Sequence, residues 1–196
     1  MASRWPVTSM VSSPTTCLAS PKTMRVFGLK KSSFSMPANP GRIERLRKTT
    51  DCAWSTLMMG MPEIGVPGAR FAGHFAAGRA AGLHSVPHSG ESTGPQSVWD
   101  ALTLLGAERI GHGTTSVQDP RLLEHLAAHR IPLEVCPTSN IATRVVDRLE
   151  EHPIRAMRDA GVIVTVNSDD PPMFGTTLGR EYEIAARLLD LDEDGL

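Results

Sequence analysis

Polar residues that can bind a metal ion or move a proton follow three short apolar stretches between residues 83 and 166. His88 and Glu91 come after the first stretch, His112 after another, and Asp169 with Asp170 after the last. Imidazole nitrogens and carboxylate oxygens together can bind a divalent metal such as zinc. A carboxylic acid three residues beyond a metal-binding His can also give a proton to a substrate held near the metal. These five residues are therefore the candidate site.

Such residues need a scaffold that brings them together, and the sequence predicts one of the α/β class. Short strands alternate with helices at intervals that suit parallel strands joined by helical crossovers. In these folds, side chains at the carboxyl ends of the strands form binding and catalytic sites. The predicted strands cover 83–87, 109–111, 132–136 and 162–166, and the predicted helices cover 69–81, 95–105, 120–129, 153–160 and 177–191. This order alone does not separate half a barrel from an open sheet.

Local signals support two of these elements in particular. Asp119 can accept a hydrogen bond from the first turn of a helix that begins at Pro120, where proline is favoured. The last predicted strand reads Val-Ile-Val-Thr-Val, a composition that predicts burial on both faces.

Each candidate residue also has a purely structural interpretation. A His at the end of a strand is often only a hydrogen-bonded polar residue. Asp169 and Asp170 precede two prolines and fit the start of a helix, and Glu91 fits a solvated loop charge. The recurrence of such groups after successive strands favours a site. Elsewhere we interpret Cys136 as a small buried side chain and the remaining histidines as helix-surface or structural residues: His74, His84, His125, His129 and His152.

The first 61 residues differ sharply in composition from the rest of the chain. Residues 1–61 contain nine Lys and Arg but two Asp and Glu, whereas residues 62–196 contain 11 and 19. This atypical basic segment fits a disordered region, a transit peptide, a basic arm that binds nucleic acid, or a mis-assigned or out-of-frame stretch. Its aromatic residues show no pattern suited to stacking bases, so we expect no nucleic-acid partner.

The cysteines and the hydropathy indicate an ordinary intracellular protein. Cys17, Cys52 and Cys136 are too few and too scattered for a disulfide framework, which favours a reducing, cytoplasmic location. No apolar run approaches the roughly 18 residues that a membrane span needs, so we expect no membrane partner.

Four motifs between residues 62 and 196 resemble those of the adenosine deaminase family. Their order and spacing agree with those of the family, and the resemblance covers its C-terminal half. The motifs are His88-Ser89-Gly90-Glu91 for H-A-G-E, residues 108–113 for E-R-I-G-H-G, residues 133–140 for L-E-V-C-P-T-S-N, and residues 168–174 for S-D-D-P-x-x-F.

The resemblance implies a fold and a chemistry. The family fold is a TIM (β/α)8 barrel, of which residues 62–196 would form about the last four βα units behind an irregular N-terminal segment. The family uses one zinc ion, Zn2+, to replace the 6-amino group of a purine with oxygen. His88 and Asp169 would be zinc ligands, and Glu91 would protonate the purine N1. His112 would orient the attacking water and help to deprotonate it, and Asp170 would bond the purine N7 or the attacking oxygen.

The expected partner is a purine nucleoside, and the sequence leaves its identity open. Adenosine, adenine and 6-amino-6-deoxyfutalosine all fit the family. Some actinobacterial members act on the last compound, a precursor of menaquinone.

Three departures from the family pattern keep other interpretations open. The sequence has no His-x-His pair, which supplies two zinc ligands in the family. Met61 stands where the family has a purine-contacting Gly before a P-E or D-E pair, and the first four βα units are not recognisable. The chain is thus expected to be an impaired enzyme, an inactive truncated or frameshifted fragment, or a non-catalytic half-barrel module that self-associates through its open strand edges.

The missing pair leads to a prediction about the metal. We expect the purified chain to bind zinc weakly, because two of the usual protein ligands remain in its sequence. Metal analysis after dialysis checks this, and tight binding of one zinc per chain would contradict it.

Overall fold

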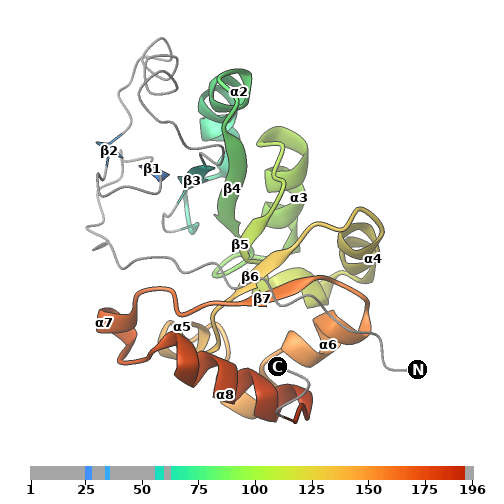
Figure 1. Ribbon diagram of the computed structural model, residues 1–196. Helices are drawn as coiled ribbons and strands as arrows, with labels where there is room; N and C mark the ends of the chain where they lie inside the picture. Colours follow the sequence, from blue (N-terminus) through green and yellow to red (C-terminus); the bar gives the residue numbers. More distant parts are fainter. Residues whose placement is uncertain (1–24, 28–33, 36–55, 60–62, 193–196) are drawn as a thin grey trace.

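The computed structural model describes residues 25–27, 34–35, 56–59 and 63–192 of the 196-residue chain. Seven strands form one sheet in the order β2-β1-β3-β4-β5-β6-β7 (Figure 1). Strands β3 to β7 run parallel to their neighbours, whereas β1 pairs antiparallel with both β2 and β3. The strands are β1 Arg25–Phe27, β2 Phe34–Ser35, β3 Thr56–Met59, β4 His84–Ser89, β5 Ile110–His112, β6 Leu133–Val135 and β7 Val164–Val166.

Helices connect the parallel strands and lie along the outer side of the strand row (Figure 1). The α-helices are α2 Ala72–Ala80, α3 Pro95–Leu104, α4 Pro120–Ala128, α5 Pro137–Ala142, α6 Ile154–Asp159, α7 Pro171–Phe174 and α8 Leu178–Leu189. Short 3-10 helices are η2 Gly68–Phe71, η3 Thr114–Gln118 and η4 Leu149–Glu151. The α/β class and the alternation of strands and helices are confirmed. The sequence pattern predicts no helix at α5 or α7, which are short and closely follow strand ends.

Capping side chains fix where two of the longer helices begin. Asp119 accepts a hydrogen bond from the Arg121 amide at 3.0 Å, as the sequence predicts, and Pro120 opens α4. Thr177 accepts from the Arg180 amide at 3.2 Å at the start of α8. Each cap satisfies an amide that the helix leaves without an internal partner.

The core lies between the sheet and the helix layer. Fully buried side chains from helices and strands pack into one cluster, which includes Phe75, Ile110, Leu122, Leu126 and Leu133. Leu122 and Leu126 are four residues apart and so lie on one face of α4. This face packs against the buried side chains of β5 and β6 in the same cluster. Within the described ranges, no helix is long and apolar enough to cross a bilayer.

Strand β7 is less buried than its composition predicts. Val164, Thr165 and Val166 are each half-buried, so the expectation of burial on both faces is wrong. The reason is position, because β7 is the last strand in the row and pairs on one side with β6. Self-association through such an edge stays a prediction.

Strands β1, β2 and β3 fall within residues 1–61, where the composition predicts no regular elements. Strand β3 extends the parallel row, since Thr56 to Met59 pair with His84 to Pro87 of β4. The division of the chain near residue 62 stays a prediction.

The alignment of β4 with β5 brings the first two candidate residues to one edge. His88 pairs with Gly111 and Ser89 pairs with His112 across the two strands. Both histidines belong to their strands, each one residue beyond the predicted strand end.

Candidate functional site

Three of the five predicted site residues meet at one atom, Nε2 of His112. The Glu91 Oε2 atom lies 3.6 Å from it and the Asp169 Oδ2 atom lies 3.9 Å from it. The imidazole of His112 is buried, whereas the two carboxylates are 20% and 27% exposed. A buried imidazole is thus placed between two acids that reach toward solvent.

His88 completes the group from the neighbouring strand. Its ring meets the His112 ring edge to face, with centroids 4.9 Å apart and planes at 84°. The ring lies over the backbone of Gly111, where an added Cβ would stand 2.5 Å from Cδ2 of His88. The ring of His88 therefore occupies space that a side chain at residue 111 would fill.

The backbone is held in the left-handed region at two site residues. The φ angles are 64° at His112 and 55° at Asp169. Residues other than glycine seldom adopt this region, and when they do, it is often where a fold holds a functional side chain in place. The backbone thus turns at both positions to direct an imidazole and a carboxylate to one point.

Ser139 orients the Asp169 carboxylate. Its hydroxyl donates to Oδ2 of Asp169 at 2.6 Å, and it is itself buried in α5. Ser139 belongs to the third motif, but sequence reasoning gave it no role because the two residues are far apart in the chain.

Asp170 does not join this group. Its side chain accepts a hydrogen bond from the Met173 amide at 3.2 Å and caps α7. The structural interpretation of the Asp169-Asp170 pair as a helix start thus holds for Asp170, and its role in substrate binding stays a prediction.

Glu63 is a site-supporting residue that the sequence analysis missed. Its Oε2 atom accepts from the amides of Glu91, Ser92 and Thr93 at 3.0, 2.7 and 2.9 Å. These bonds hold the loop that carries Glu91. The other oxygen, Oε1, is buried without a hydrogen-bond partner in the described structure. The resemblance marked residue 63 only as part of a Pro-Glu pair.

Burial shifts the proton affinities of the central groups in opposite directions. Removal from water raises the pKa of Glu91, although nearby His88 opposes the shift. Removal from water also lowers the pKa of His112, with Asp169 opposing, and lowers the pKa of His88. Burial thus shifts the carboxyl group and the two imidazoles toward their neutral forms, which is a useful tendency for acid–base chemistry.

Cys136 lies near the same point but is not poised as a nucleophile. Burial, followed by the nearby Asp169 carboxylate, raises the pKa of the thiol well above its usual range. The interpretation of Cys136 as a small buried side chain is therefore favoured.

His152 is a second residue that the sequence analysis did not place in the site. It is 4% exposed, so the alternative of a helix-surface residue is wrong. Its Nε2 atom lies 3.2 Å from Oδ1 of Asn140, and Nδ2 of Asn140 lies 3.4 Å from Nδ1 of His112. No local pattern in the sequence links these residues, which the fold brings together from η4, α5 and β5.

We expect the fold to become less stable as the pH is lowered, because of His152. Burial lowers the pKa of this imidazole from 6.5 to about 4. Between these values the unfolded chain binds the proton and the folded chain does not, so stability is lost as pH falls. From pH 7 to pH 5 the loss due to His152 is about 2 kcal/mol. Denaturant unfolding of the wild type and of His152→Gln at several pH values measures it.

The control for this experiment is His129→Gln, which removes an exposed imidazole at the end of α4. This variant should keep the pH dependence of the wild type, whereas His152→Gln should show a smaller loss of stability from pH 7 to pH 5. Equal slopes in all three proteins would contradict the assignment.

The donor set of the site fits a divalent metal. Two sets of three residues each bring their potential ligand atoms within 4.8 Å of one another. One set is His88, Glu91 and His112, and the other is His112, Cys136 and Asp169. Neutral imidazoles and an oriented carboxylate are the forms that bind zinc. The predicted ligands His88 and Asp169 fall in different groups, which share His112.

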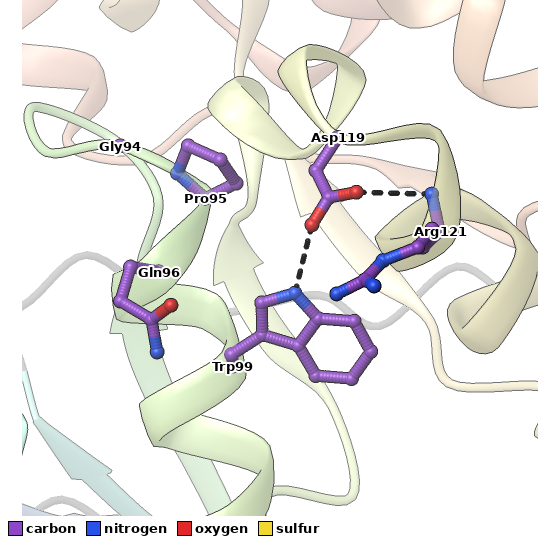
Figure 2. Close-up of a pocket in the computed structure, with 6 residues that line it drawn as sticks. All are labelled: Gly94, Pro95, Gln96, Trp99, Asp119 and Arg121. Carbon is purple, nitrogen blue, oxygen red and sulfur yellow. Dashed lines mark hydrogen bonds between the residues drawn. The ribbon is translucent and has the colours of Figure 1, made fainter.

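A separate open pocket of about 430 Å³ lies between the starts of α3 and α4 (Figure 2). Trp99 donates from Nε1 to Oδ2 of Asp119 at 2.9 Å there, beside Arg121 (Figure 2). Asp119 also caps α4 through its other oxygen. The pocket contains none of the five predicted site residues.

Known proteins resemble this chain along most of its length. The model of the adenosine deaminase family matches residues 21–196. The chain is 70% identical over 138 residues to an aminodeoxyfutalosine deaminase of Streptomyces avermitilis, which covers 70% of this chain and 38% of that protein. It is 41% identical over 168 residues to an adenosine deaminase of Pectobacterium atrosepticum, covering 86% of this chain and 50% of that protein.

The fold agrees with that of solved deaminases. An adenine deaminase from Arthrobacter aurescens superposes with a TM-score of 0.70 at 31% identity, covering 79% of this chain and 48% of that chain. An amidohydrolase from Burkholderia ambifaria solved with bound zinc gives a TM-score of 0.68 at 25% identity and covers 79% of this chain and 44% of that chain. The structure thus has the fold of part of a TIM-barrel deaminase, and the chain spans half or less of the length of these relatives. On the match of its sequence to the family model, this chain belongs to the adenosine deaminase family.

Proposed function

We propose that this chain carries the acid, the orienting imidazole and two metal ligands for hydrolytic deamination of a 6-aminopurine nucleoside. The observation that carries the proposal is the meeting of Glu91 and Asp169 at Nε2 of His112, with the His88 ring in edge contact. A carboxyl group, an imidazole and metal-binding groups within so small a space suit a metal-assisted hydrolysis with proton transfer.

Glu91 is the general acid in this proposal. Burial raises its pKa, and Glu63 fixes the backbone of its loop through three amides. Its proton goes to the ring nitrogen next to the reacting carbon, which makes that carbon more electrophilic. The oxygen of a water molecule then bonds to the carbon. One proton of this water passes to the amino group, which leaves as ammonia, and the other returns to Glu91.

His112 and Asp169 arrange the other side of the reaction. Nε2 of His112 points to the space between the two carboxylates, where it can orient the attacking oxygen. Asp170 remains our candidate for substrate binding. One of its carboxylate oxygens caps α7, so the other oxygen would have to contact the substrate.

Zinc is the metal that this donor set fits. His88 and Asp169 would hold it, with Ser139 orienting the Asp169 carboxylate. A zinc ion acts as a Lewis acid that makes water acidic enough to serve as a nucleophile near neutral pH. The fold relative with bound zinc supports this choice.

We expect slow turnover from the chain by itself. His88 and Asp169 are the two residues assigned to zinc, whereas catalytic zinc sites commonly have three protein ligands. The purified chain, given excess zinc and adenosine, should release ammonia slowly, and Glu91→Gln should remove that release. Bound zinc with no more ammonia than the variant produces would contradict the proposal and favour an inactive fragment.

Aminodeoxyfutalosine is the second candidate substrate, and the sequence identity to known deaminases favours it. The relatives of that name from Streptomyces avermitilis and Streptomyces coelicolor are 70% and 68% identical to the chain over 138 residues. The adenosine deaminase relative from Pectobacterium atrosepticum is 41% identical. Both substrates carry the same 6-aminopurine, so the acid and the metal ligands would act alike on each.

A competition between the two substrates distinguishes them. The value of kcat/KM should be larger for aminodeoxyfutalosine than for adenosine. A preference for adenosine would remove this second candidate and leave the general deaminase proposal standing.

A further inference from the structure

A buried chain of hydrogen bonds leads from the backbone of α6 to the back of His112. Its members are Ile154, His152, Asn140 and His112, and we call it the His152 chain. Asn140 is fully buried, and His152 and His112 are 4% and 2% exposed. Buried polar groups of this kind are costly unless each donor faces an acceptor, so the directions of the bonds are constrained.

The direction of the first bond is fixed by a backbone amide. The Ile154 N–H donates to Nδ1 of His152 at 3.2 Å. An amide nitrogen cannot accept, so Nδ1 of His152 carries no proton. The proton of the neutral ring is therefore on Nε2, which donates to Oδ1 of Asn140 at 3.2 Å.

The second bond then fixes how the Asn140 amide is turned. With Oδ1 toward His152, Nδ2 faces Nδ1 of His112 at 3.4 Å. The Thr114 hydroxyl also donates to Oδ1 at 3.2 Å, which is consistent with this orientation. The reverse orientation would set the amide nitrogen of Asn140 against the Nε2–H of His152, donor against donor.

We propose that His152 is a positioning residue that acts through Asn140 to hold His112 in its Nε2–H tautomer. Since Nδ2 of Asn140 can only donate, Nδ1 of His112 must accept, and the ring proton lies on Nε2. That nitrogen faces Glu91 and Asp169 at 3.6 and 3.9 Å. His112 therefore offers a hydrogen-bond donor to the site.

This inference deepens the proposed function and changes the expected role of one residue. The family resemblance implies that His112 helps to deprotonate water, which would require an unprotonated Nε2. In the Nε2–H tautomer, His112 instead orients the attacking oxygen by donating a hydrogen bond to it. The catalytic consequence rests on the proposed function, whereas the tautomer itself does not.

The tautomers can be read directly by NMR on the full chain labelled with 15N-histidine. Long-range 1H–15N spectra distinguish protonated from unprotonated ring nitrogens, and single-histidine variants assign the signals. In the wild type, both His112 and His152 should show a protonated Nε2 and an unprotonated Nδ1. The opposite tautomer at either residue would overturn the inference.

Three variants separate the links of the His152 chain. His152→Leu removes the donor to Asn140, so His112 should become a mixture of tautomers. His152→Gln keeps an amide donor at that position and should preserve the wild-type tautomer of His112. Asn140→Asp replaces the donor facing His112 with an acceptor, so a proton should appear on Nδ1 of His112.

Unchanged His112 signals in a folded His152→Leu or Asn140→Asp variant would contradict the inference. If His152→Leu does not fold, the wild-type spectrum and Asn140→Asp still decide. In an active preparation, His152→Leu should lower kcat by roughly 10-fold to 100-fold with a smaller change in KM, and His152→Gln should restore most of it. Correct tautomers without any turnover would count against the proposed function alone.

Discussion

Replacing Glu91 by glutamine should lower kcat for deamination by roughly 100-fold to 10,000-fold, the usual contribution of a general acid. Glutamine keeps the size of the side chain and its hydrogen-bonding capacity but has no proton to give to the substrate. Burial raises the pKa of Glu91, and its Oε2 atom lies 3.6 Å from Nε2 of His112, so the variant loses a group placed to transfer a proton at the centre of the site. The rate of ammonia release at saturating substrate, with zinc in excess, measures the effect.

Metal content separates the acid role from a ligand role. We assign zinc to His88 and Asp169, so Glu91→Gln should bind as much zinc as the wild type. Loss of zinc together with activity would show that Glu91 is a ligand, which its distance from His88 and His112 permits. Glu124→Gln, on the exposed side of α4, is the matched control and should retain both zinc and activity.

Replacing Gly111 by alanine should weaken zinc binding by roughly 10-fold to 100-fold, as the loss of support for a metal ligand typically does. The new methyl group would stand 2.5 Å from Cδ2 of His88, which is closer than two carbon atoms approach without a shift. Since the φ angle of Gly111 is not left-handed, alanine adds no backbone strain there. The ring of His88 is then the part that moves.

Gly73→Ala is the control for this effect. Gly73 lies in α2, and a Cβ there meets no heavy atom within 4 Å. This variant should keep the zinc affinity of the wild type and gain up to about 1 kcal/mol of stability from better helix propensity. Equilibrium dialysis with zinc measures the affinities of both variants. Equal zinc affinity in Gly111→Ala and the wild type would mean that His88 is not a ligand.

The sequence was most informative where local chemistry decides structure. Asp119 followed by Pro120 correctly predicted the start of α4, because capping depends on neighbours within one turn. The alternation of apolar stretches and helical spacing predicted the parallel α/β arrangement. The placement of His88, His112 and Asp169 around the ends of parallel strands predicted that they would meet, since those ends lie along one edge of the sheet.

The tertiary structure decided what supports those residues, because their partners are distant in the chain. Glu63 holds the Glu91 loop from 28 residues away, and His152 reaches Asn140 from 12 residues away. No helical or strand period relates such positions, so the sequence assigned His152 to the surface or to structure and gave Glu63 no role. The edge position of β7 was likewise decided by the order of strands. The sequence by itself determined that His88, Glu91, His112 and Asp169 lie near one another, because local patterning places them at or just beyond strand ends. Only the folded chain determined where the ring protons lie, because long-range hydrogen bonds fix which nitrogen of His112 carries the proton.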